Sequence, residues 1–129
     1  MKKIMMVVML MVSPCVLADG WKKMAHDNNK TVYFSPKSKR ITDTGVKLWV
    51  MNDYDVEQEI NDEKFLSDHI LFLTNCIEEL VTPVSMVVFR GKGGTGGVVF
   101  SDNVPARWMP PSPGSLGESI IKVSCRKEE

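Results

Sequence analysis

Residues 46–54, with the sequence VKLWVMNDY, form the strongest strand pattern in the chain. Side chains alternate between the two faces of a strand, so Val46, Leu48 and Val50 share one face. Trp49 and Met51 share the other face. A strand of a one-sided sheet usually alternates apolar and polar residues, whereas this stretch is apolar on both sides. It therefore predicts a strand whose two faces both need cover.

Further segments on both sides of this stretch have the composition of strands. The pattern predicts strands at residues 21–25, 31–35, 70–76, 84–90 and 98–101. The segments between them differ in character. Residues 36–44 are polar and basic, and residues 55–64 are highly charged and indicate a loop or a short exposed helix.

The C-terminal part of the chain predicts one helix. After a Pro-rich break, Ser115 and Glu118 have the spacing of a capping box. In this motif the Ser115 side chain accepts from the backbone N–H of Glu118, and the Glu118 side chain reaches back to the N–H of Ser115. The helix should extend to about Arg126. Its apolar stripe consists of Leu116, Ile120 and Val123.

Residues 1–18 have the pattern of an export signal. Two lysines are followed by an apolar run over residues 4–12, which is too short to span a bilayer because that takes about 20 apolar residues. Val16 and Ala18 suit the small-residue positions of a signal peptidase site. The sequence therefore predicts a signal peptide over residues 1–18 and one exported domain over residues 19–129.

Cys15 leaves a second interpretation of this signal open. A lipoprotein signal ends in a cysteine that becomes the lipidated first residue, so Cys15 could anchor the domain in a membrane. The expected location is the periplasm, the outer-membrane surface or the medium. Membrane contact is expected only if Cys15 is lipidated.

The two remaining cysteines predict one disulfide. Paired thiols outside the cytosol tend to oxidise, and Cys76 and Cys125 are the only partners left after removal of the signal. Residue parity places Cys76 on the same strand face as Phe72, so the C-terminal helix should cover that face.

The opposite face carries Leu71 and Leu73 and needs another cover. A curled sheet, a loop or a second copy of the chain could supply it, and the last would make a homodimer.

The composition narrows the function classes. The chain has 16 basic and 16 acidic residues, so its formal charge is zero, which argues against a nucleic-acid binder. With 43% hydrophobic residues it can bury one core and is not intrinsically disordered.

Several motifs that can indicate catalysis or cofactor binding lack the spacing or the structural context that such sites require. A G-x-G-x-x-G pattern at residues 91–96 leads into a strand, whereas a dinucleotide site requires a helix there. Alternating acidic residues over 53–59 lack the spacing of a calcium loop, so a solvated loop is favoured. His26 and His69 show no zinc spacing, and no nucleophile elbow is present. We expect no metal, no cofactor and no catalytic site.

One compact basic patch, consisting of Lys37, Lys39 and Arg40, is the candidate ligand-binding site. It could engage acidic glycans or phosphate groups, and the alternative is a solvated loop. Trp21, Trp49 and Trp108 fit the core or its edge, although tryptophan is also enriched at binding hot spots.

The order of these segments resembles the surface-adhesin protein E family of exported bacterial proteins. The resemblance rests on Trp21, on VYFSPKS at residues 32–38, on VKLWVMNDY at residues 46–54, on Cys76, and on a C-terminal signature that ends at Cys125. It implies an antiparallel sheet with a C-terminal helix tied to it by a disulfide. The expected fold is thus α+β, with a single antiparallel β-sheet of about five to six strands and the helix packed on one face.

The resemblance also implies a function outside the cytoplasm. We expect a non-enzymatic, adhesin-like binding module whose ligand is an extracellular protein of the host-matrix type or an acidic glycan. The alternative is a periplasmic or envelope-associated structural protein without a host ligand.

Overall fold

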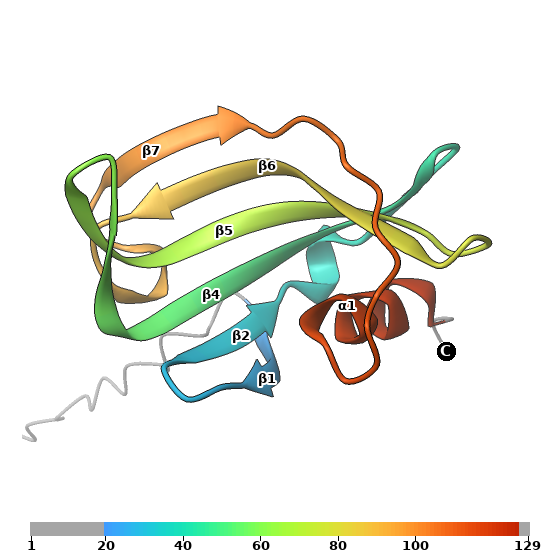
Figure 1. Ribbon diagram of the computed structural model, residues 1–129, viewed down its shortest axis with the longest axis horizontal. Coiled ribbons are helices and arrows are strands. Elements are labelled where there is room, and N and C mark those ends of the chain that lie inside the picture. Colours follow the sequence, from blue (N-terminus) through green and yellow to red (C-terminus); the bar gives the residue numbers. More distant parts are fainter. Residues whose placement is uncertain (1–19, 127–129) are drawn as a thin grey trace, which may run out of the picture.

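The computed structural model describes residues 20–126, which form one antiparallel sheet and one α-helix (Figure 1). The signal peptide, the cleavage site after Ala18 and Cys15 lie outside the described residues. The strands are β1 (Lys22–His26), β2 (Lys30–Phe34), β3 (Arg40–Thr42), β4 (Gly45–Ile60), β5 (Glu63–Asn75), β6 (Leu80–Phe89) and β7 (Val98–Asn103). The helix is α1 (Leu116–Cys125).

The sheet has seven strands in the order β1-β2-β4-β5-β6-β7, and β3 pairs with the start of β4. The expected count of about five to six strands is therefore too low. The additional strand is β3, inside the polar and basic segment 36–44, where no strand was expected. With three residues, β3 is too short to produce a period-two pattern. The turn before β4 holds it in place, where the Thr42 hydroxyl donates to the Gly45 carbonyl at 2.8 Å.

The expectation of a loop or helix over residues 55–64 is also wrong. These residues extend β4 and β5 into a long hairpin that is closed by a two-residue turn. Asn61 and Asp62 adopt positive φ angles of 50° and 67°, as this kind of hairpin turn requires. A register shift between Asp53 and Gln58 bends the hairpin, and Figure 1 shows its tip turning away from the line of the strands.

The α1 helix covers the face of the sheet that parity predicted. Ile120 of α1 is 1% exposed and packs in one cluster with Leu48 and Val50 of β4, which are fully buried. Val32 and Phe34 of β2 complete this side of the core. Burying each of these side chains contributes about 1.5–3 kcal/mol, so this contact is the main source of tertiary stability for the helix.

The helix begins at the predicted cap, with one difference. The Ser115 side chain accepts from the N–H of Glu118 at 3.3 Å, as expected. The Glu118 carboxylate, however, accepts from the N–H of Gly114 at 2.7 Å rather than from that of Ser115. The N–H of Ser115 already donates to the carbonyl of Ser112 at 3.1 Å, so the reciprocal bond moves one residue upstream.

A disulfide ties α1 to the sheet, which confirms the predicted pairing. Cys76 follows β5 and bonds to Cys125 at the end of α1, with a Cα–Cα distance of 5.7 Å. Lys39 adds a second connection, because its ammonium donates to the carbonyls of Val123 and Arg126 at 3.1 and 2.8 Å.

In residues 20–126, no helix has the length and apolar character needed to cross a membrane.

Candidate binding site

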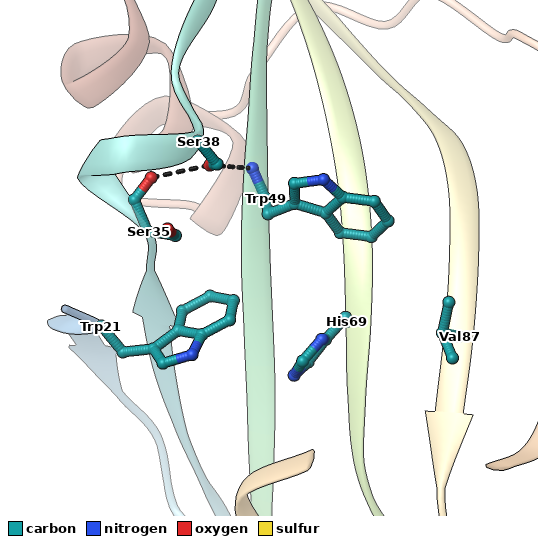
Figure 2. A pocket seen from close by; sticks show the side chains of 6 residues that line it. All are labelled: Trp21, Ser35, Ser38, Trp49, His69 and Val87. Carbon is teal, nitrogen blue, oxygen red and sulfur yellow. Dashed lines mark hydrogen bonds between the residues drawn. The ribbon is translucent and has the colours of Figure 1, made fainter. Parts of the chain in front are cut away.

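The sheet face opposite α1 carries an open hollow lined by aromatic rings (Figure 2). Its volume is about 360 Å³. Trp21 comes from the segment before β1, Trp49 from β4, His69 from β5 and Val87 from β6. Ser35 and Ser38, from the loop after β2, complete the lining.

The strand register brings these residues together. Met51 pairs with His69, and His69 pairs with Val87, so these three residues share this face with Trp49, which lies two positions before Met51 on β4. The expected position of Trp49 opposite the core face is thus confirmed. Trp21 lies over this face as well, with its ring 4.9 Å from that of His69.

His69 is the centre of the aromatic cluster. Its ring lies 4.7 Å from Phe89 and 6.4 Å from Trp49, measured between centroids. Within residues 20–126, its Nε2 atom is buried and has no hydrogen-bond partner. Burial lowers the pKa of the His69 imidazole, because the charged form loses hydration that the surrounding rings do not replace.

The Gly-rich loop between β6 and β7 covers one end of this face. The Ser67 hydroxyl donates to the carbonyl of Gly91 at 2.6 Å and accepts from the N–H of Gly94 at 2.9 Å. Asp53 accepts from the N–H of Gly93 at 2.9 Å. Lys92 adds contacts to Asp53 and Asp55 at 3.6 and 3.8 Å. The segment is a strand–strand loop, as expected, and two of the acidic residues between positions 53 and 59 hold it.

Glycine is required where this loop crosses His69. A Cβ atom at Gly94 would lie 2.8 Å from Nε2 of His69, and Gly94 has a φ of +78°. Both the contact and the backbone angle exclude a larger residue without a shift. The loop therefore lies directly on the imidazole of His69.

The basic patch predicted from the sequence divides between two sides of the molecule. Lys39 points to the C-terminal carbonyls of α1. Arg40 is exposed, and its guanidinium donates to the carbonyls of Lys37 and Lys39 at 3.0 and 3.1 Å. Lys37 is exposed and lies near Gly20, the neighbour of Trp21. The loop also borders the hollow through Ser38, whose hydroxyl donates to the Ser35 carbonyl at 2.7 Å and accepts from the N–H of Trp49 at 3.0 Å.

A polar cluster lies on the helix side of the sheet. Asp68 accepts from the Asn52 amide at 2.9 Å and from the Tyr54 hydroxyl at 3.2 Å. Burial raises the pKa of Asp68 despite these bonds, and burial together with the neighbouring carboxyl raises the pKa of Tyr54. In the part of the chain from residue 20 to 126, no group of three or more His, Cys, Asp and Glu side chains is arranged to hold a metal ion.

The family assignment agrees with this architecture. The profile of the surface-adhesin protein E family matches residues 21–126. The chain belongs to this family. Membership of the surface-adhesin protein E family supports an adhesin-like surface protein and implies export. No curated protein matches the chain.

Two solved structures of Haemophilus influenzae protein E share the fold of this surface-adhesin protein E family member. Crystal form II has a TM-score of 0.66 at 13% identity, covering 91% of this chain and 96% of that one. Another structure has a TM-score of 0.64 at 13% identity, covering 88% and 90% respectively. At this identity the likeness concerns the fold.

Sequence reasoning did not place His69 and Val87 in the lining of a hollow, and it placed Trp21 and Trp49 at the core or its edge. Parity within one strand assigns a face, but only the register between strands shows which residues share a hollow. The sequence signals for this face were the alternation of Trp49 and Met51 on one strand and of Leu71 and Leu73 on the next.

Proposed function

We propose that the protein is a non-enzymatic, exported binding module that uses the face opposite α1 to hold an extracellular ligand. The observation that supports this is the hollow between Trp21, Trp49 and His69. Half-buried tryptophans on an open concave surface can desolvate a ligand at low entropic cost, because their side chains are rigid. The ligand class is an extracellular protein of the host-matrix type or an acidic glycan.

The side chains of the hollow are arranged for binding rather than for catalysis. Ser38 and His69 both line it, but the Ser38 hydroxyl is engaged by Ser35 and by the backbone of Trp49. The Nε2 atom of His69 is buried and faces Gly94. A nucleophile with an adjacent base would need these two groups to meet, and each is directed to a different neighbour.

The test is adhesion by cells that produce the protein. Cells with the wild-type chain should bind at least one of immobilised collagen, fibronectin, laminin or heparin, and cells with Trp21→Ala should bind it more weakly. Trp108→Ala is the matched control, because Trp108 is 40% exposed and does not line the hollow. Wild-type cells that bind no better than cells without the protein would contradict the proposal.

The alternative of an envelope protein without a host ligand predicts a different result. In that case a second copy of the chain would cover the face opposite α1, as a homodimer. Sedimentation of the wild-type protein and of Trp21→Ala distinguishes the two. A wild-type dimer that becomes monomeric in the variant, together with no adhesion, would support the alternative.

A further inference from the structure

We infer that the hollow binds an acidic sugar residue, whose ring stacks on the indoles of Trp21 and Trp49 and whose anionic group meets the lysines at the rim. This inference rests on the proposed function and specifies its ligand. It follows from the shape of the hollow, its aromatic lining and the distribution of charge around it.

The aromatic lining suits a sugar ring. The C–H groups on one face of a pyranose carry partial positive charge, and an indole presents the negative face of its π system to them. The hydroxyls at the ring edge remain in water, which requires an open site. The hollow at Trp21 and Trp49 is open to solvent, whereas a purely apolar side chain would gain most from an enclosed pocket.

The volume restricts the ligand to a small group. At about 360 Å³, the hollow is near the lower end of the range of roughly 300–1,000 Å³ typical of small-molecule sites. It accommodates one ring of a saccharide, and the rest of a chain would extend over the surface.

The charge at one end of the hollow favours an anion. Lys47 precedes Trp49 by two residues on β4, so both lie on the same face with Cα atoms about 7 Å apart. Arg40 pairs with Lys47 across β3 and β4. Lys37 is exposed in the loop that borders Trp21. The two lysine side chains are long enough to reach a carboxylate or sulfate on a ring stacked in the hollow, whereas the guanidinium of Arg40 is held by the carbonyls of Lys37 and Lys39.

The acidic residues on this side do not cancel these cations. Asp53 and Asp55 lie toward the opposite end of the face, where both contact Lys92 and Asp53 also accepts from the N–H of Gly93. Asp43 is exposed in the turn between β3 and β4, beyond Arg40. Near the hollow, the chain thus combines flat aromatic surface with unbalanced positive charge. A neutral sugar would use only the first feature.

The experiment measures binding of defined saccharides to the mature exported protein by NMR titration. The probes are sialyllactose, which carries a carboxylate, a sulfated heparin tetrasaccharide, and neutral lactose. We expect at least one acidic probe to shift the indole N–H signals of Trp21 and Trp49 but not that of Trp108. We also expect its affinity to be at least about tenfold higher than that of lactose, a difference that shrinks as salt rises.

Two variants and two controls separate the contributions. Trp21→Ala should weaken acidic-probe binding about tenfold or more, and Lys37→Gln combined with Lys47→Gln should remove the preference over lactose. Trp108→Ala and Lys122→Gln are the matched controls, since both residues are exposed outside the hollow. The lysine variant also serves if Trp21→Ala fails to fold, because Lys37 and Lys47 are exposed.

The outcomes distinguish a failure of this inference from a failure of the proposed function on which it rests. If neither acidic probe binds at millimolar concentration, or if the lysine variant binds both acidic probes as wild type does, the inference is overturned. Adhesion to matrix proteins that depends on Trp21 would in that case leave the proposed function standing. If the wild-type protein shows neither saccharide binding nor adhesion, both this inference and the proposed function are overturned.

Discussion

At the scale of single residues, His69 and Gly94 show how this face is held together. The His69 ring is packed among Trp21, Trp49 and Phe89, and the backbone of Gly94 lies against its Nε2 atom. The imidazole therefore packs as a flat, half-buried ring that also lines the open hollow. These contacts lead to two predictions, one for the pH dependence of the free energy of unfolding and one for substitution of Gly94 in the Gly-rich loop.

Acid should destabilise the protein through His69. Burial lowers the pKa of this imidazole below its usual value of 6.5, so the unfolded chain binds a proton more readily. The free energy of unfolding should thus fall as pH decreases from about 6.5 through the lower pKa of the folded state. His69→Gln should flatten this part of a urea-denaturation profile. Equal profiles for wild type and His69→Gln would disprove the role of His69.

Gly94→Ala should destabilise the protein more than Gly97→Ala. Both glycines have positive φ angles, of +78° and +91°, but only at Gly94 would the added Cβ meet His69. The contact should add about 1–2 kcal/mol to the backbone cost that the two substitutions share. Thermal and urea denaturation of the two variants measures the difference. Equal losses would indicate that the loop does not rest on His69 in solution.

At the scale of elements, α1 depends on three kinds of contact with the sheet. Ile120 contributes apolar burial, the Cys76–Cys125 bond closes the covalent link, and Lys39 holds the C-terminal carbonyls. A ten-residue helix is too short to be stable alone in water, so these contacts decide whether it forms. The disulfide and the lysine can be tested separately.

Cys125→Ser should lower the free energy of unfolding by about 4 kcal/mol, because the bond closes a loop between residues 49 positions apart. Amide exchange should show that α1 becomes the least protected element. Cys76→Ser is the matched variant and should have the same effect. Wild-type protein with both thiols open to alkylation in the native state would contradict the expectation.

Lys39→Ala should cost about 1–2 kcal/mol, since it removes two charge-assisted bonds to Val123 and Arg126 at the negative end of the helix dipole. Lys37→Ala is the control in the same loop and should change stability by no more than about 0.5 kcal/mol. Denaturation curves of the two variants provide the comparison. A loss at Lys39 no larger than that at Lys37 would show that the ammonium does not cap α1.

At the scale of the whole molecule, the two sides of the sheet differ in how they are covered. The side under α1 holds the main core, whereas the opposite side carries the hollow and the Gly-rich loop. A sheet that is apolar on both faces fits this division, because the second face is only partly covered and leaves aromatic side chains at the open hollow. Figure 1 shows α1 near one end of the sheet and the bent hairpin at the other.

Export should remove residues 1–18. Mass spectrometry of the protein recovered from producing cells should find a chain that begins at Asp19, because Val16 and Ala18 suit signal peptidase. A chain that begins at a lipid-modified Cys15 would overturn this cleavage site and establish the membrane anchor. Protease treatment of intact cells then shows on which side of the outer membrane the domain lies.

Local patterns were sufficient for several features of the fold. The alternation at residues 46–54, the cap at Ser115 and the pairing of Cys76 with Cys125 each depend on neighbouring residues or on a unique choice of partner. The same patterns missed β3, which is too short, and misjudged residues 55–64. There the charged composition masked a hairpin that is stabilised by pairing between β4 and β5.

The sequence by itself determined which residues of 46–54 and 70–76 share a face, where α1 begins, and that one disulfide would hold it. Only the tertiary structure decided that Trp21, Trp49 and His69 meet in one hollow, and that Lys39 caps α1 while Lys37 lies near Gly20, the neighbour of Trp21. The physical reason is the distance along the chain over which each interaction acts. Periodicity and capping act within a few residues, whereas a site on a sheet depends on register between strands and on loops that fold across them.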